Sequence, residues 1–235
     1  MKNLTSILFL MFLALFLVAG NAFSATYTFE DTQIFWPNYN NGTADDFDDD
    51  LGDNPMILGM TVEVNANNIL ETVTINFADG NPGERTEFDS LFINNDGLDY
   101  EWDYYIKDGS DNAWYGDNLP AEGAYKVADG YTPATIDLDK TGGREGHING
   151  IQNIGQDLTP IYGYTVTYYD SSDTLVYDLF DLGISLEENN WRIGYTPYCA
   201  NDVISGTPVP EPATLFLLGS GLLGFAGTRR RKSKK

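Results

Sequence analysis

The chain has 235 residues, with 35 Asp and Glu against 13 Lys and Arg, and a formal net charge of −22. All the acidic residues lie between Glu30 and Glu211, where 35 acidic residues meet only 6 basic ones and leave a formal charge near −29. This excludes nucleic acid as a partner, because binding phosphates requires basic side chains. An aromatic content of 14% is too high for a disordered acidic tail. We therefore expect one folded domain, residues 25–206, between two terminal signals.

The N-terminus has the pattern of a secretory signal peptide, residues 1–24. Lys2 supplies a positive charge, residues 7–19 form an uncharged apolar run, and Ala22 and Ser24 are small residues before a cleavage site. The apolar run is too short to span a bilayer comfortably. The pattern predicts export through the Sec translocon, with cleavage after Ser24 or, as the alternative, after Ala22. A buried core helix is the alternative with less support.

The C-terminus, residues 207–235, predicts a second signal. A proline-rich turn precedes an uncharged apolar stretch, residues 213–228, for which we expect a transmembrane helix. A basic tail follows, which the positive-inside rule places in the cytoplasm. Its residues include Arg229, Arg230, Arg231 and Lys232. A plain single-pass anchor is the alternative interpretation.

The motif Pro210-Glu211-Pro212, the short Leu- and Gly-rich stretch and the basic end together resemble the PEP-CTERM sorting signal. The resemblance implies recognition by an exosortase, a membrane cysteine protease that processes the tail near this motif. It also implies a Gram-negative bacterium, transient anchoring in the inner membrane, and release to the cell surface or extracellular matrix. Acidic or neutral exopolysaccharide is then the expected partner. Residues 199–202, Cys-Ala-Asn-Asp, are similar to the segment that closes the exported domain of many such proteins, which implies a fold extending to about Ile204.

The segment between the two signals has an all-β pattern that predicts a β-sandwich or jelly roll of about nine to twelve strands. Asn67-Asn68 and residues 170–173 are expected hairpin turns. In residues 101–107, alternation predicts Trp102, Tyr104 and Ile106 on one face. The clearest expected strands are residues 27–29, 60–64, 70–77, 90–93, 101–107, 125–127, 164–169, 175–179 and 191–195.

An acidic loop is the strongest candidate for a metal site, because six of the nine residues 45–53 are Asp. Their mutual repulsion favours a bound cation, and alternate carboxylates can converge on calcium. The candidate ligands are Asp46, Asp48, Asp50 and Asp53. A solvated loop without metal is the alternative. Residues 94–97 and 108–112 carry weaker versions of this pattern and are expected to be turns.

Trp114 is the best candidate for an exposed aromatic contact with a glycan, because it lies in an expected loop. Trp36, Trp102 and Trp191 are more consistent with a core. Catalytic signatures are scarce: the chain has one histidine, His147, and one cysteine, Cys199. A histidine-based zinc site and an intrachain disulfide are therefore excluded.

We conclude from the sequence that the chain is a non-catalytic surface or matrix protein that is exported, sorted and associated with exopolysaccharide or biofilm, with calcium as a candidate stabilising ion. Two alternatives remain open. One is a carbohydrate-binding module for a specific glycan, and the other is a polysaccharide-active enzyme, which paired carboxylates alone cannot establish in so acidic a chain.

Overall fold

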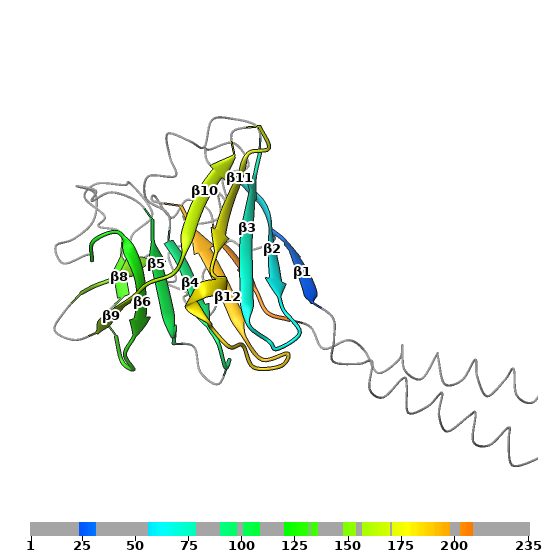
Figure 1. Ribbon diagram of the computed structural model, residues 1–235. Coiled ribbons are helices and arrows are strands. Elements are labelled where there is room, and N and C mark those ends of the chain that lie inside the picture. Colours follow the sequence, from blue (N-terminus) through cyan, green and yellow to red (C-terminus); the bar gives the residue numbers. More distant parts are fainter. Residues whose placement is uncertain are drawn as a thin grey trace, which may run out of the picture.

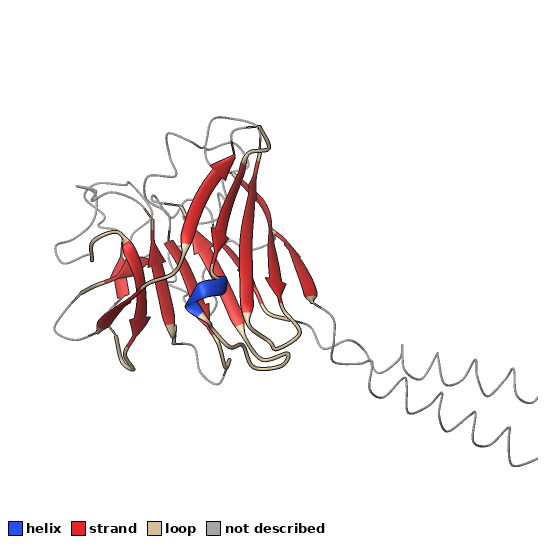
Figure 2. Cartoon of the chain, in the orientation of Figure 1, coloured by secondary structure: helices blue, strands red, loops and turns tan. Residues whose placement is uncertain are grey.

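The computed structural model describes residues 24–31, 56–78, 90–97, 101–108, 120–131, 133–135, 148–153, 157–169, 171–197 and 203–208. Within them, two antiparallel sheets pack face to face as a β-sandwich (Figure 1). The only helical element of the described residues is a single 3-10 turn, η4 (Phe180–Leu182), drawn in blue in Figure 2. The prediction of an all-β sandwich is therefore confirmed.

The sheets are built from strands distant in the sequence. The five-stranded sheet has the order β1 (Ala25–Glu30), β2 (Ile57–Val64), β3 (Leu70–Phe77), β11 (Thr174–Asp178) and β10 (Thr165–Tyr169). The six-stranded sheet has the order β13 (Ile204–Gly206), β12 (Arg192–Thr196), β4 (Ser90–Asn94), β5 (Tyr104–Lys107), β6 (Gly123–Val127) and β9 (Leu158–Ile161). A separate pair contains β7 (Pro133–Thr135) and β8 (Ile148–Ile151). The described residues thus form thirteen strands. Our estimate of nine to twelve was low because strands of three or four residues show too little alternation to be recognised.

Both expected hairpin turns are confirmed. Between β2 and β3, the Asn65 side-chain oxygen accepts hydrogen bonds from the backbone N–H groups of Asn67 and Ile69, at 2.9 and 3.1 Å. Asn68 takes a left-handed conformation with φ of 59°, which asparagine tolerates better than most residues. Asp173, with φ of 47°, lies in the turn between β10 and β11.

The main core lies between the two large sheets. Alternate residues of β2, β3 and β11 meet those of β4, β5 and β12, as the two-residue period of a strand requires. Trp191 is 2% exposed and contacts β1 edge-on, with ring centroids 5.1 Å from Tyr27 and 6.1 Å from Phe29. This tryptophan therefore fastens the first strand to the opposite sheet.

A second core covers the outer face of the six-stranded sheet. It contains Phe92, Trp102, Tyr105, Tyr125, Val127, Ile151, Leu158 and Val203. The prediction that Trp102, Tyr104 and Ile106 share one face is wrong. Strand β5 begins only at Tyr104, so alternation does not extend back to Trp102, whose ring lies 5.5 Å from Phe92. Tyr104 and Ile106 face the main core instead.

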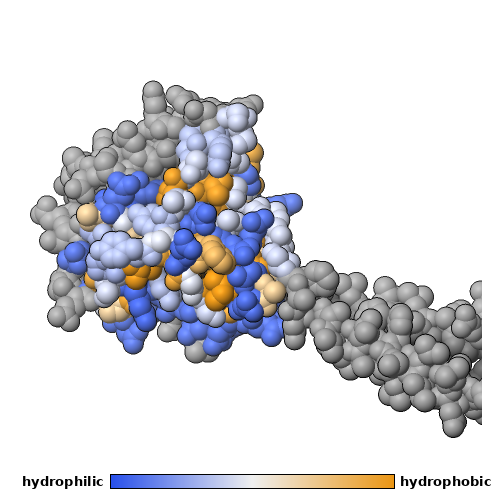
Figure 3. All heavy atoms as spheres, in the orientation of Figure 1, coloured by the Kyte–Doolittle hydropathy of each residue, from blue (hydrophilic) through white to orange (hydrophobic). Residues whose placement is uncertain are grey.

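The outer face of the five-stranded sheet is polar, as expected for an antiparallel sheet with one face in water. Eight threonines alternate along its strands with buried or partly buried residues that face the core: Thr26, Thr28, Thr61, Thr72, Thr74, Thr165, Thr167 and Thr174. The face of the molecule in Figure 3 is correspondingly hydrophilic or near neutral, with separate apolar areas.

Candidate functional site

The candidate ligands for calcium, Asp46, Asp48, Asp50 and Asp53, lie outside the described residues, as do Trp114, His147 and Cys199. The sorting motif, the apolar stretch 213–228 and the basic tail also lie outside them. Within the described ranges, no group of three or more His, Cys, Asp or Glu residues is placed to hold a metal ion. The calcium prediction therefore stays a prediction.

Residues 94–97, one of the weaker acidic patterns, form a turn, as expected. Asn94 is buried, and its side-chain oxygen accepts hydrogen bonds from the backbone N–H groups of Asp96 and Gly97. Its side-chain nitrogen donates to the carbonyl oxygen of Glu101 at 2.7 Å. Asn190 donates from its side chain to the carbonyl oxygen of Asp96. These bonds give the asparagines a structural role in closing the turn between β4 and β5.

An aromatic ladder crosses the outer face of the six-stranded sheet. Phe92 of β4 pairs with Tyr105 of β5, and Tyr105 pairs with Tyr125 of β6. The rings are stacked, with centroids 5.1 Å apart in the first pair and 6.3 Å in the second. Tyr125 in turn pairs with Pro160, an exposed residue of the edge strand β9. The ladder therefore runs from a fully buried phenylalanine to β9, the last strand of the sheet among the described residues.

The edge of the sheet next to this ladder carries the most exposed large side chain among the described hydrophobic residues. Tyr162 directly follows β9 and is 85% exposed. The register pairs Ala124 with Ile161, the last residue of β9, so the chain leaves the sheet at Tyr162 beside the first residues of β6. Tyr162 lies close enough to Tyr125 to contribute to the raised pKa of its hydroxyl. The structure thus places the exposed Tyr162 near the buried Tyr125. We call these two residues, together with Tyr164 two positions further along the chain, the tyrosine edge.

Tyr125 is held in place by three neighbours. Its hydroxyl donates a hydrogen bond to the carbonyl oxygen of Ala121 at 2.7 Å. Its side chain lies against the backbone of Gly123, where a Cβ would approach the hydroxyl oxygen to 3.0 Å and two ring carbons to 3.1 and 3.2 Å. Glycine is therefore what permits the close approach. With the ring of Tyr105 stacked on it, Tyr125 forms a rigid base for the edge.

Burial and nearby negative groups shape the ionisation of these tyrosines. Burial raises the pKa of Tyr164, and the carboxylates of Glu122 and Asp108 and the Tyr125 hydroxyl raise it further. Burial also raises the pKa of Tyr125, with a smaller effect from Tyr162. The hydroxyls of Tyr125 and Tyr164 therefore stay protonated at neutral pH, when each can both donate and accept a hydrogen bond.

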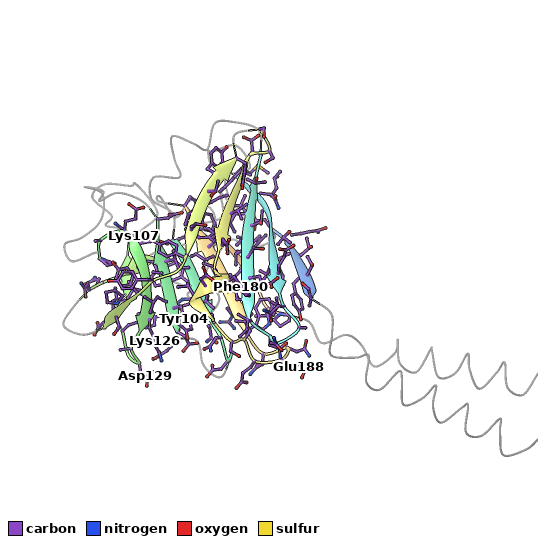
Figure 4. All side chains as sticks on the ribbon, in the orientation of Figure 1. Tyr104, Lys107, Lys126, Asp129, Phe180 and Glu188 are labelled. Carbon is purple, nitrogen blue, oxygen red and sulfur yellow. The ribbon has the colours of Figure 1, made fainter. Side chains whose placement is uncertain are left out.

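The carboxylates of Asp108 and Glu122 lie on either side of the segment that contains Trp114. Residues 109–119 join Asp108, after β5, to Pro120, which leads into β6. Both attachment points lie at the end of the sheet where Lys107 pairs with Gly123. Figure 4 shows Lys107 at this end, with Tyr104 and Lys126 towards the other.

The sequence pointed to Trp114 but did not reveal the tyrosine edge, because no local pattern marks Tyr162 as exposed.

The last described strand leads directly into the C-terminal signal. In β13, Gly206 lies under the ring of Phe29, and after it Thr207 is exposed while Pro208 is buried. Residues 208–232 match the family model of the PEP-CTERM protein-sorting motif. The chain carries a PEP-CTERM sorting signal. The folded strand β13 thus ends only two residues before this signal begins.

The PEP-CTERM motif confirms the resemblance seen in the sequence, and it supports an exported protein that is anchored in the membrane and sorted by an exosortase. The comparisons found no similar protein among curated proteins and none among solved structures. In the part of the chain that the structure describes, no helix has both the length and the apolar character needed to cross a membrane.

Proposed function

We propose that the chain is a non-catalytic surface or matrix protein that an exosortase processes and releases into an exopolysaccharide layer. The observation that carries the proposal is the PEP-CTERM motif at residues 208–232, directly after the last strand of a β-sandwich. A β-sandwich stabilised by two hydrophobic cores is suited to a lasting structural role outside the cytoplasm. The mature domain works there as an adhesive or structural module of the matrix.

The strong negative charge supports the same role. The 35 acidic and 6 basic residues between Glu30 and Glu211 give the domain a formal charge near −29, which keeps it soluble and repels other copies. Divalent cations can bridge such a surface to acidic glycans. We propose that calcium binds the loop of Asp46, Asp48, Asp50 and Asp53, where it offsets the repulsion among six aspartates.

Sorting is tested in the cells that make the protein. Deletion of the exosortase, or the substitution Glu211→Ala, is expected to leave the unprocessed chain in the inner membrane. Immunoblots of membrane, surface and matrix fractions measure the outcome. The substitution Thr207→Ala, outside the motif, is the matched control and should leave release normal. Equal release from cells with and without the exosortase would contradict the proposal.

Calcium binding is tested by calorimetry and thermal melts in calcium and in chelator. We expect saturable binding and a higher melting temperature in calcium, both lost in the double variant Asp48→Ala, Asp50→Ala. Asp129→Ala, at an exposed turn of the sandwich, removes one charge elsewhere and is the control. The same melting temperature in calcium and in chelator would show that the loop is only solvated charge.

A carbohydrate-binding module is the second candidate function, and the tyrosine edge favours it. The exposed ring of Tyr162 can supply apolar stacking and the exposed carboxylate of Glu122, directly before β6, can accept hydrogen bonds, the two interactions that a sugar ring requires. Trp114 belongs to the segment that joins the end of β5 to the start of β6, the strand next to β9. Saturable glycan binding that is lost in Trp114→Ala would support this function, whereas unchanged binding would remove Trp114 from it.

A further inference from the structure

We propose that the tyrosine edge binds a neutral, pyranose-based polysaccharide, with the ring of Tyr162 stacked on the apolar face of one sugar. The inference rests on the second proposed function, and it names the contact residue and the class of glycan. It comes from the outward position of Tyr162 at the end of the aromatic ladder, and not from the residues that suggested a glycan in the sequence.

The exposure of Tyr162 is the first step. This side chain is 85% exposed, whereas Tyr105, Tyr177 and Tyr195 of the same domain are no more than 1% exposed. A tyrosine side chain has an apolar ring and one hydroxyl, so it is suited to a partner that is apolar on its face and polar at its rim. A pyranose ring has this character, with C–H groups on a face and hydroxyls around the edge.

The rigidity of the support is the second step. Beneath the edge, Tyr125 is fixed by its bond to Ala121, by Gly123 and by its stack on Tyr105. Tyr162 lies in the short connection between β9 and β10, where Gly163 lies against Asp181 and Tyr164 packs against the main core. A contact residue whose chain is held on both sides loses less conformational freedom on binding than one on a free loop. The edge is therefore preorganised for a ligand.

The local charge decides which glycans fit. Glu122 is exposed at the edge, and it acts together with Asp108 on the hydroxyl of Tyr164. Of the two lysines in the strands beside the edge, Lys107 is only 5% exposed, and Lys126 is exposed but pairs with Thr159, towards the other end of β6 from Glu122. Carboxylates accept hydrogen bonds from sugar hydroxyls but repel uronic acids, sulfates and phosphates. The edge therefore favours a neutral polysaccharide over an acidic one.

Two other occupants fit less well. An extended peptide could add to β9, the edge strand of this sheet among the described residues, but Pro160 lacks a backbone N–H in that four-residue strand and weakens such pairing. A second copy of the chain would bring together two proteins of charge −22 with carboxylates at the contact. The carboxylates that oppose these partners do not oppose a neutral sugar.

The experiment uses the full-length chain purified in detergent micelles, in buffer with EDTA so that no divalent cation can bridge charges. Binding is measured to immobilised dextran, mannan, β-1,3-glucan and β-1,4-glucan, and to alginate as the acidic polymer. We expect saturable binding to at least one neutral polymer and weaker binding to alginate. Tyr162→Ala should weaken the neutral interaction about tenfold, which corresponds to about 1.4 kcal/mol.

The matched control is Tyr169→Ala, which removes a tyrosine that is 49% exposed on the other sheet and should leave binding unchanged. Because Tyr162 is almost fully exposed, its loss should not alter the thermal melt. The inference is overturned if no neutral polymer binds, if both variants bind like the parent chain, if both lose binding equally, or if alginate binds best in EDTA.

Failure of this inference can be told apart from failure of the proposed function. Sorting is read from cell fractions and does not depend on Tyr162, so Tyr162→Ala should be processed normally but washed from the matrix more readily. Normal sorting without binding to any neutral polymer would refute the glycan site alone. Glycan binding by a chain that is released without an exosortase would refute the sorting proposal alone.

Discussion

Substituting Gly206 by alanine should separate the last strand of the domain from the first. A Cβ at Gly206 would lie 2.4–2.5 Å from three ring atoms of Phe29, far inside contact distance. The ring cannot easily move away, because Trp191 packs against it at a centroid distance of 6.1 Å. Overpacking of this kind costs about 1–3 kcal/mol of unfolding free energy. We expect Gly206→Ala to lose that amount.

The assay is urea unfolding followed by tryptophan fluorescence, to which Trp191 contributes from beside the altered contact. A double-mutant cycle identifies the cause. In a Phe29→Ala background the added methyl group meets no ring, so Gly206→Ala should cost at least about 1 kcal/mol less than in the parent chain. Thr207→Ala, at the exposed next residue, is the control for a change in the same segment.

Simple additivity would refute this reasoning. If the effects of Phe29→Ala and Gly206→Ala add within about 0.5 kcal/mol, the two residues do not share a contact. A Gly206→Ala variant as stable as the parent would also refute it. A coupled result would show that the strand after the predicted cleavage site and the strand before the sorting signal stabilise each other.

Two further predictions concern buried polar groups. Burial raises the pKa of Tyr105, with Asp108 adding to the effect and the Ser90 hydroxyl opposing it, so the unfolded chain releases this proton first as pH rises. The contribution of Tyr105 to the free energy of unfolding should therefore be intact below pH of about 10, the ordinary pKa of tyrosine, and should fall above that pH. A melting temperature that does not fall above pH of about 10 would contradict this. Asn94→Ala should cost about 1–3 kcal/mol, because it leaves the Glu101 carbonyl and the turn N–H groups without their bonds. Urea unfolding measures this loss, and a cost no larger than that of the exposed control Asn67→Ala would contradict it.

Local patterns predicted much of the fold. Alternation over five to eight residues revealed strands such as β2, β3 and β10, because a strand turns successive side chains to opposite faces. The turns at Asn68 and Asp173 could be recognised because these residues tolerate a left-handed backbone. The sorting signal was the clearest of all, since its motif, apolar stretch and basic tail are read by other proteins as sequence.

Other features depended on tertiary contacts. Pairing of Val73 with Tyr177, or of Gly194 with Phe92, joins strands far apart in the chain, and periodicity contains no information about the partner strand. Trp102 was assigned to the wrong face because alternation does not show where a strand begins.

The sequence by itself determined that this protein is exported and sorted, and that its domain is an acidic β-sandwich, because these properties depend on local composition, spacing and period. Only the tertiary structure decided that Trp191 anchors the first strand while Tyr162 lies in the open. Both are aromatic residues next to strands, and their sequence surroundings do not distinguish them. Burial depends on what the other sheet covers, and that is a property of the whole folded chain.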